Sequence, residues 1–326
     1  MKILIIYGTR PEKIKMLPVI HALEKRNVPV VVYETGQHVL SGTRMVDGNN
    51  DFDYFKMLSH ALEIAKDSSY ILVQGDTTST LLGALTALYS RKRLGHIEAG
   101  LRSYDQRMIE EKIRCMVDHM ADDLFAPTNF ARETLEREDV SGNIVLTGNP
   151  IIDMLRKYAP AKLADKYIVV TLHRPENVDD KNILTEKIMA IETLRKIVKK
   201  PLIFPIHPRT KNALSKFKLS IPESWKVVDP LPFSKMINLL GTAHVVLTDS
   251  GGIQEECCYL RKPTITLRVS TERPETLDLS NLVADSREEI LMAYKEVIKL
   301  PFSYKDTPYG DGTAGKKIAD YICELQ

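Results

Sequence analysis

The sequence predicts an α/β protein built from two doubly wound parallel sheets. Its 326 residues are more than one hydrophobic core usually organises, and they suit two domains. Short runs of β-branched and other apolar residues alternate with helical patterns along both halves of the chain, which is typical of parallel strands joined by helices. Polar residues follow many of these runs, at the sheet edge where open α/β sheets bind ligands.

The expected strands form two series separated by a break in the pattern. The first series comprises residues 2–7, 28–33, 70–73, 94–97, 123–126 and 143–146, and the second comprises 167–171, 202–206, 225–228, 244–247 and 264–267. The alternation stops at residues 157–162, which form the predicted linker. We therefore expect an N-terminal domain over residues 1–160 and a C-terminal domain over 161–312, with a helix at 313–326 that packs back on the first domain.

The charge balance and the cysteines argue against several classes of protein. The 45 Lys and Arg residues nearly cancel the 43 Asp and Glu residues, so no overall field favours nucleic acid or an anionic membrane as partner. The four cysteines show no metal-site spacing, and no run of 18 apolar residues could span a bilayer. We expect a cytoplasmic protein that needs neither a metal nor another cofactor.

Residues 249–256, with the sequence DSGGIQEE, follow an apolar run and begin a helical pattern. Such a turn presents backbone N–H groups and the positive end of a helix dipole, and Gly251 and Gly252 have no Cβ that would block a phosphate. Ser250 adds a hydroxyl, and Glu256 is placed to accept from ribose hydroxyls. A plain glycine turn with Ser250 as helix cap explains this segment alone equally well.

The other end of the chain favours the phosphate interpretation. The apolar run 2–7 leads directly into Gly8-Thr9-Arg10-Pro11-Glu12, and a proline suits the first turn of a helix. Arg10 then follows the first strand and Lys15 lies near the start of the next helix. Both cations are expected to point into the crevice at the sheet edge, so that two facing crevices would hold one nucleotide-sugar.

Four further residues at predicted strand ends or helix starts suit proton abstraction from carbon, which needs carboxylate bases and cations for a departing phosphate. They are Asp76, Glu98, Glu110 and His207. Each has a purely structural alternative: Asp76 as a helix cap, Glu98 paired with Arg102, Glu110 or Glu111 in a solvated first turn, and His207 as an exposed loop histidine. The residues themselves do not choose between Glu110 and Glu111.

Several ordered motifs resemble the UDP-N-acetylglucosamine 2-epimerases along nearly the whole chain. They are GTRPEKIK at 8–15, QGDTT at 74–78, HIEAGLR at 96–102, HRPEN at 173–177, the 249–256 segment and TERPE at 271–275. The resemblance implies a GT-B fold, which has two Rossmann-like domains with the substrate between them, and a homodimer. It also implies metal-free, reversible inversion at C2 of the sugar, by elimination of UDP to a glycal and re-addition of UDP.

The resemblance also implies roles for individual residues. It places Asp76, Glu98, Glu110 and His207 on catalytic positions, and Arg10, Lys15, Phe233, Ser250, Gly251, Gly252, Glu256 and Arg273 on substrate-binding positions. The chain departs from the bacterial pattern around residues 56–58, where a stretch that helps to bind a second UDP-N-acetylglucosamine is missing, and at Pro175, where an arginine is usual. Gln37 and His38 of that second site remain, and we expect an enzyme without allosteric activation.

Three other functions fit the same motifs. A hydrolysing 2-epimerase would release N-acetylmannosamine and UDP, a GT-B glycosyltransferase would pass the sugar to an acceptor, and a sensor would bind the nucleotide-sugar without turnover. A modified sugar such as a diacetamido uronate is also compatible, because contacts to the C3 and C6 substituents are not part of these motifs.

Overall fold

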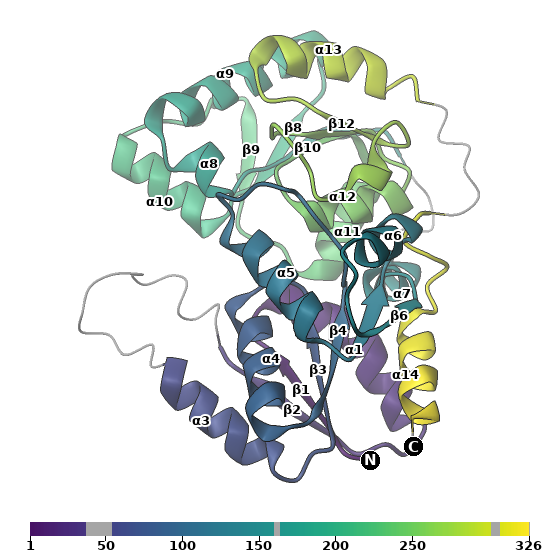
Figure 1. The fold of residues 1–326 in the computed structure, drawn as a ribbon. Helices are drawn as coiled ribbons and strands as arrows, with labels where there is room; N and C mark the ends of the chain where they lie inside the picture. The colour runs from purple at the N-terminus through teal and green to yellow at the C-terminus, as the bar shows by residue number, and fades with distance from the viewer. Residues whose placement is uncertain (37–53, 160–163, 301–306, 326) are drawn as a thin grey trace. The chain divides into compact units, whose positions relative to one another are not determined.

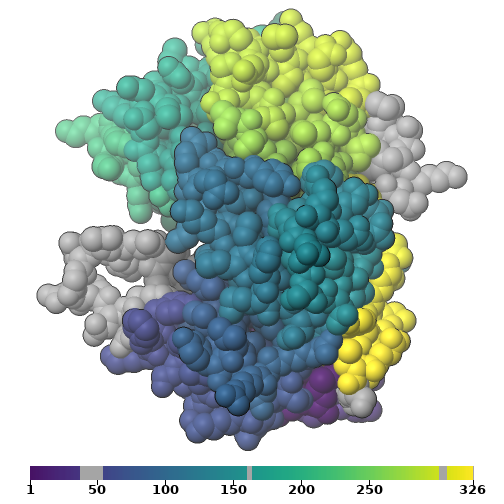
Figure 2. All heavy atoms as spheres, in the orientation of Figure 1, coloured from purple at the N-terminus to yellow at the C-terminus, as the bar shows by residue number. Residues whose placement is uncertain are grey.

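The computed structural model describes residues 1–36, 54–159, 164–300 and 307–325, and it divides into two compact units (Figure 1). Unit 1 comprises Met1–Arg156 and Pro308–Gln326, and unit 2 comprises Lys157–Thr307. Figure 2 shows the yellow C-terminal helix on the surface of unit 1, beside the teal and purple segments of the same unit. The chain thus begins and ends in unit 1.

Unit 1 contains a six-stranded parallel sheet in the order β2-β1-β3-β4-β5-β6. Its strands are β1 Ile3–Tyr7, β2 Val30–Glu34, β3 Tyr70–Gln74, β4 Arg93–Ile97, β5 Asp123–Ala126 and β6 Asn143–Leu146. Its described helices are α1 Arg10–Glu24, α3 Tyr54–Ala65, α4 Thr78–Ser90, α5 Ile109–Met120, α6 Asn129–Arg137, α7 Pro150–Tyr158, which runs into unit 2, and α14 Ala314–Glu324. Strand order switches between β1 and β3, the place where such sheets bind ligands.

Helices cover both faces of this sheet, which explains why its strands are continuous apolar runs. Successive side chains of a strand point to opposite faces. Ile3 and Ile5 of β1 pack in one core with residues of α1 and α14, whereas Leu4 and Ile6 pack in a second core with residues of α3, α4, α5 and α6. All four side chains are completely buried.

Helix α14 is fixed to the rest of unit 1 by polar contacts at its start and along its length. The Asp153 carboxylate accepts hydrogen bonds from the backbone N–H groups of Ala314 and Gly315, at 3.1 Å each, and so satisfies two of the unpaired donors of the helix start. Arg26 of the segment after α1 donates from Nε to Asp320, at 2.9 Å. The helix therefore completes the layer that α1 begins (Figure 1).

Unit 2 repeats the architecture with the strand order β12-β11-β10-β7-β8-β9, again parallel throughout. Its strands are β7 Tyr167–Thr171, β8 Leu202–Pro205, β9 Trp225–Val228, β10 Ala243–Thr248, β11 Thr264–Thr266 and β12 Asn281–Val283. Its described helices are α8 Pro175–Val178, α9 Lys181–Val198, α10 Pro208–Phe217, α11 Phe233–Gly241, α12 Gly251–Tyr259 and α13 Arg287–Val297, with a 3₁₀ turn at Pro274–Thr276. Strand order switches between β7 and β10.

The two doubly wound parallel sheets predicted from the sequence are confirmed. The strand β12 was not expected, because it has only three residues and lies at the edge of its sheet. Within the described ranges, no helix is long and apolar enough to cross a membrane.

Candidate functional site

The loop from β1 to α1 is held by one buried carboxylate. Thr9 caps α1, and Glu12 accepts from the backbone N–H groups of Gly8, at 3.1 Å, and Thr9, at 2.7 Å. The same carboxylate accepts from the Thr77 hydroxyl at 2.8 Å, which joins this loop to the loop after β3. Burial raises the pKa of Glu12 above its ordinary value, although these hydrogen bonds oppose the shift. Arg10 lies exposed at the start of α1.

Asp76 follows β3 but does not cap α4, because Thr77 takes that place by accepting from the N–H groups of Ser79 and Thr80. Asp76 instead forms an ion pair with Arg114 of α5. The Arg114 side chain is almost fully buried, whereas that of Asp76 is 30% exposed. The helix-cap interpretation of Asp76 is therefore wrong. Its partly exposed carboxylate instead pairs with Arg114 after the end of β3.

Glu98 occupies the end of β4 with an unusual backbone conformation. Its φ is +68°, in the left-handed region that side chains other than glycine rarely adopt. Its buried carboxylate contacts Lys15 and Gln74, and it accepts from Nδ2 of Asn149 at 2.6 Å. Both carboxylate oxygens are thus fixed by side chains from three other elements.

The structural alternative for Glu98, an ion pair with Arg102, is wrong. Arg102 instead contacts Asp118 at 2.8 Å and Glu138 at 2.6 Å. Glu98, itself the left-handed residue, and Arg102 therefore point to different partners. Lys15, expected to face the nucleotide, is 7% exposed and forms its ion pair with Glu98.

The structure distinguishes the two glutamates that the sequence left equivalent. Glu111 is buried and accepts from the Ser103 N–H and hydroxyl, at 2.9 Å each, from the Tyr104 N–H at 2.8 Å, and from Arg114 at 2.5 Å. It fixes the loop before α5. Glu110 is half-buried in the first turn of α5, next to this anchor, and is the better placed of the two for chemistry.

The loop from β10 to α12 in unit 2 has the geometry expected of an anion seat. Ser250 is the N-cap residue of α12, but its hydroxyl accepts none of the helix N–H groups, so these donors remain for another acceptor. At Gly251 a Cβ would lie 2.6 Å from Oε1 of Glu272, which explains that glycine by packing. At Gly252 a Cβ would meet only the Ser250 hydroxyl, at 3.9 Å, so packing does not require a glycine there.

Asp249, just before that seat, organises the neighbouring loop after β7. It is fully buried, and its Oδ2 accepts from the N–H groups of His173 and Arg174, at 2.9 Å each, and from Asn177 at 3.1 Å. Its Oδ1 lies 2.8 Å from Nδ1 of His173. Burial raises the pKa of Asp249, but His173 and the backbone donors outweigh it and lower the pKa to about 2.

His207 and His173 lie side by side in unit 2, with ring centroids 5.3 Å apart. His207 is exposed and caps α10, because its Nδ1 accepts from the Arg209 N–H at 3.2 Å. His173 is oriented by a buried carboxylate, and its side chain is 33% exposed. The sequence places His173 after the expected strand 167–171 and in a family motif, but gives it no role, and its pairing with Asp249 adds that information.

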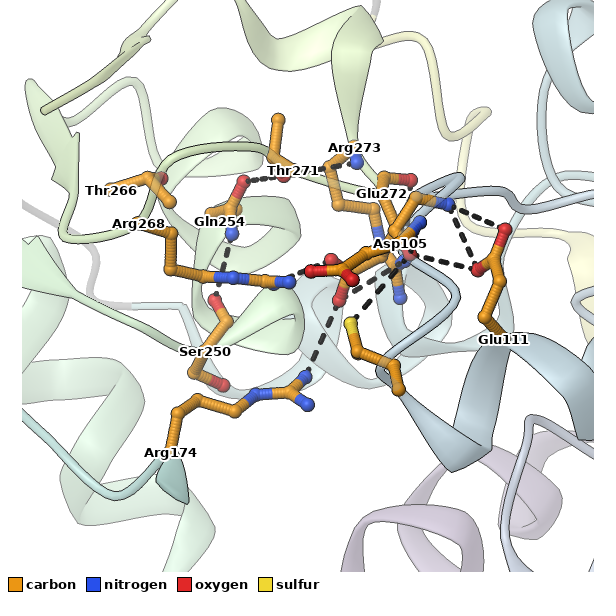
Figure 3. A network of polar contacts seen from close by, with 12 residues as sticks. Asp105, Glu111, Arg174, Ser250, Gln254, Thr266, Arg268, Thr271, Glu272 and Arg273 are labelled. Carbon is orange, nitrogen blue, oxygen red and sulfur yellow. Dashed lines mark hydrogen bonds and ion pairs between the residues drawn. The ribbon is translucent and has the colours of Figure 1, made fainter. Parts of the chain in front are cut away.

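A cluster of buried charges lies beside α12 (Figure 3). The Glu272 carboxylate accepts from Arg268 at 2.5 Å and lies 3.4 Å from Arg174 and 3.9 Å from Arg273. Nε of Arg273 also forms an ion pair with Glu255. Arg273, an expected nucleotide contact, is thus held by two carboxylates of its own unit.

Two of the remaining candidates lie on helices of unit 2. Phe233 begins α11, and its half-buried ring stands edge-on to Tyr158 with centroids 5.9 Å apart. Glu256 is half-buried on α12. Gln37 and His38 lie outside the described residues. Among the residues that are described, no group of three or more His, Cys, Asp or Glu side chains could hold a metal ion.

Comparison with known proteins agrees with the resemblance seen in the motifs. A family model described as UDP-N-acetylglucosamine 2-epimerase matches residues 54–323. The UDP-N-acetylglucosamine 2-epimerase of Methanocaldococcus jannaschii is 36% identical, over 98% of this chain and 98% of the relative. The UDP-2,3-diacetamido-2,3-dideoxy-D-glucuronate 2-epimerase of Pseudomonas aeruginosa is 34% identical over the full length of both chains.

A solved structure gives the same result for the fold. The crystal structure of the M. jannaschii UDP-GlcNAc 2-epimerase in complex with UDP-GlcNAc and UDP superposes with a TM-score of 0.89, at 35% identity, over 99% of this chain and 100% of that one. The predicted GT-B fold is thereby confirmed. The chain belongs to the UDP-N-acetylglucosamine 2-epimerase family of isomerases.

Proposed function

We propose that the protein interconverts UDP-N-acetylglucosamine and UDP-N-acetylmannosamine by reversible elimination and re-addition of UDP. A base removes the C2 proton, the C2–H electron pair forms a C1–C2 double bond, and the C1–O bond to UDP breaks with its electron pair on the phosphate. A proton then reaches C2 from the opposite face as UDP adds back to C1. The observation that carries the proposal is the placement of carboxylates at the sheet edge of unit 1, in a chain of this family.

Unit 1 supplies the proton chemistry in this proposal through Asp76, Glu98 and Glu110. Asp76 pairs with Arg114, and Glu98 pairs with Lys15. Asp76 follows β3 and Glu98 follows β4, which are neighbours in the sheet. General acid–base groups placed in this way contribute about a hundred- to ten-thousandfold in rate.

Unit 2 binds UDP at the start of α12 in this proposal. The unpaired N–H groups there, the Ser250 hydroxyl, and a Gly252 that packing does not require support a diphosphate at this position. Gly251, Glu256, Phe233 and Arg273 complete the expected contacts, with Phe233 at the uracil and Glu256 at the ribose. Arg10 of unit 1 is assigned to the phosphates.

His207 and His173 are both assigned to the reacting sugar phosphate. The His207 ring accepts at Nδ1, so its Nε2 carries the proton and is a donor. His173 has Nδ1 2.8 Å from the Asp249 carboxylate, which fixes its ring orientation. Either ring could therefore stabilise the negative charge that develops on the departing UDP.

Proton NMR of the purified protein with UDP-N-acetylglucosamine in deuterated water tests this function. We expect UDP-N-acetylmannosamine to form, with deuterium at C2 of both sugars, and no change when a chelator is added. Steady release of free N-acetylmannosamine would identify a hydrolysing enzyme instead. A Glu98→Gln variant that binds UDP but incorporates no deuterium is the matched control.

The sugar itself has a second candidate. The P. aeruginosa relative is named for a diacetamido glucuronate and is 34% identical, close to the 36% of the M. jannaschii relative. Parallel assays with UDP-2,3-diacetamido-2,3-dideoxy-D-glucuronate decide between the two sugars, because the better substrate has the higher kcat/KM. We further propose a cytoplasmic homodimer; sedimentation of the purified protein would test the dimer, and fractionation of cells would test the location.

A further inference from the structure

A buried histidine–aspartate pair in unit 1 lies behind the two loops that carry Asp76 and Glu98. His96 of β4 and Asp118 of α5 are both completely inaccessible, and Nδ1 of His96 lies 2.7 Å from Oδ1 of Asp118. Nε2 of His96 lies 2.8 Å from the carbonyl oxygen of Gly75. A carboxylate and a carbonyl can only accept, so both ring nitrogens act as donors and the ring is an imidazolium.

The charge of this imidazolium is balanced locally. Burial raises the pKa of Asp118, but His96 and Arg102 outweigh it, and the net pKa lies below the ordinary value. Arg102 lies 2.8 Å from Oδ2 of Asp118 and also pairs with Glu138. The pair is therefore fully ionised and fully hydrogen-bonded, the condition under which buried charges are tolerated.

Each partner of the pair holds one loop. His96 holds the carbonyl of Gly75, which directly precedes Asp76 and has a φ of +78°. Asp118 accepts from the N–H of Gly100 at 3.1 Å, two residues after Glu98. Both loops leave their strands in left-handed conformations, at Gly75 and at Glu98, so neither direction follows from the strand itself.

We propose that His96 is a positioning residue that, together with Asp118, sets the directions of the loops that carry Asp76 and Glu98. Charged hydrogen bonds are about twice as strong as neutral ones, and they fix an irregular loop that has no regular ladder of its own. This inference rests on the catalytic roles proposed for Asp76 and Glu98, and His96 itself touches neither substrate nor reacting atoms.

The test compares kcat, KM and UDP affinity for wild type and His96→Gln with UDP-N-acetylglucosamine. Glutamine supplies a donor to only one of the two acceptors and carries no charge. We expect kcat per UDP-binding molecule to fall by about a hundredfold, the loss typical of a misplaced catalytic group. We expect KM and the calorimetric Kd for UDP to change by less than about threefold, because the phosphate contacts are unaffected.

Tyr70→Phe is the matched control. It removes a fully buried hydrogen bond of 2.8 Å, from Tyr70 to Asp123, at the opposite end of the same strands. A general loss of packing would lower kcat equally in the two variants, whereas a positioning role lowers it only in His96→Gln. An equal decrease in both would overturn the inference.

A double-mutant cycle with Asp76→Asn tests whether His96 acts through Asp76. If it does, adding His96→Gln to Asp76→Asn lowers kcat by much less than adding it to wild type. If His96→Gln does not fold, Asp118→Asn replaces it, and the same loss of kcat is expected. If neither His96→Gln nor Asp118→Asn folds, or if their kcat lies within threefold of wild type, His96 has only a structural role and the inference is overturned. An inactive wild type would instead refute the proposed function.

Discussion

Asp249 makes the stability of unit 2 depend on pH in a calculable way, and Asp249→Asn tests this. The substituted amide can keep its oxygen toward the N–H groups of His173 and Arg174 and place its nitrogen near the His173 ring, so that mainly the charge is lost. The folded-state pKa of Asp249 is about 2, against an ordinary value of 3.8. A depressed carboxyl pKa stabilises the folded state above the unfolded pKa, and this stability is lost as the pH falls towards the folded pKa.

The magnitude follows from the difference between the two pKa values. A shift from 3.8 to about 2 corresponds to about 2 kcal/mol of stability at pH 7, of which about half is lost by pH 3. Asp249 is completely buried, so solvent does not screen this contribution. The stability difference between wild type and Asp249→Asn should therefore shrink by about 1 kcal/mol between pH 7 and pH 3.

Urea unfolding followed by tryptophan fluorescence measures this difference. Trp225 is the only tryptophan of the sequence and packs against Phe204 in the core of unit 2, so its emission follows that unit. Asp179→Asn is the control, because Asp179 pairs with Arg209 at 50% exposure and such pairs contribute at most about 1 kcal/mol. A difference between wild type and Asp249→Asn that stays constant from pH 7 to pH 3 would refute the reasoning.

Four further outcomes are expected. Glu98→Gln should lower kcat by about a hundredfold or more with UDP affinity nearly unchanged, and its unfolding would instead indicate a structural role. Arg10→Ala and Ser250→Ala should each weaken UDP binding about tenfold or more in calorimetry, with kcat less affected. Gly83→Ala should cost about 1–3 kcal/mol in urea unfolding, because its Cβ would lie 2.3 Å from Val73. Turnover should depend hyperbolically on UDP-N-acetylglucosamine, and a reverse reaction that stalls until UDP-N-acetylglucosamine is added would contradict the expected absence of allosteric activation.

The sequence predicts strands well where β-branched and other apolar residues form a short run between helical patterns. The bounds of four strands agree with the structure residue for residue: 123–126, 143–146, 167–171 and 225–228. The expected strand 202–206 ends one residue early, at Pro205, and β12 has too few residues to form a pattern. Local composition thus predicts interior strands such as 167–171 and edge strands such as 143–146, and it leaves β12 unpredicted.

The site was harder to predict because its contacts join distant segments. The choice between Glu110 and Glu111 depends on the loop at Ser103, which encloses the second carboxylate. The pairing of Glu98 depends on a left-handed residue, and no pattern of apolar and polar residues reveals one. His173 stands out only when β7 and β10 are known to be neighbours in the sheet.

The same physical arrangement occurs in each unit, and the difference between the two copies separates positioning from chemistry. In both, a fully buried aspartate accepts from backbone N–H groups of a loop and has a histidine at its other oxygen, through Asp118 and His96 or through Asp249 and His173. The second ring nitrogen of His96, Nε2, lies at the carbonyl oxygen of Gly75, and the ring is inaccessible to solvent. The His173 side chain is one-third exposed, so its second nitrogen is within reach of a ligand. A carboxylate that orients a histidine therefore closes one ring into the scaffold and leaves the other accessible, which is why we propose positioning for His96 and a direct contact for His173.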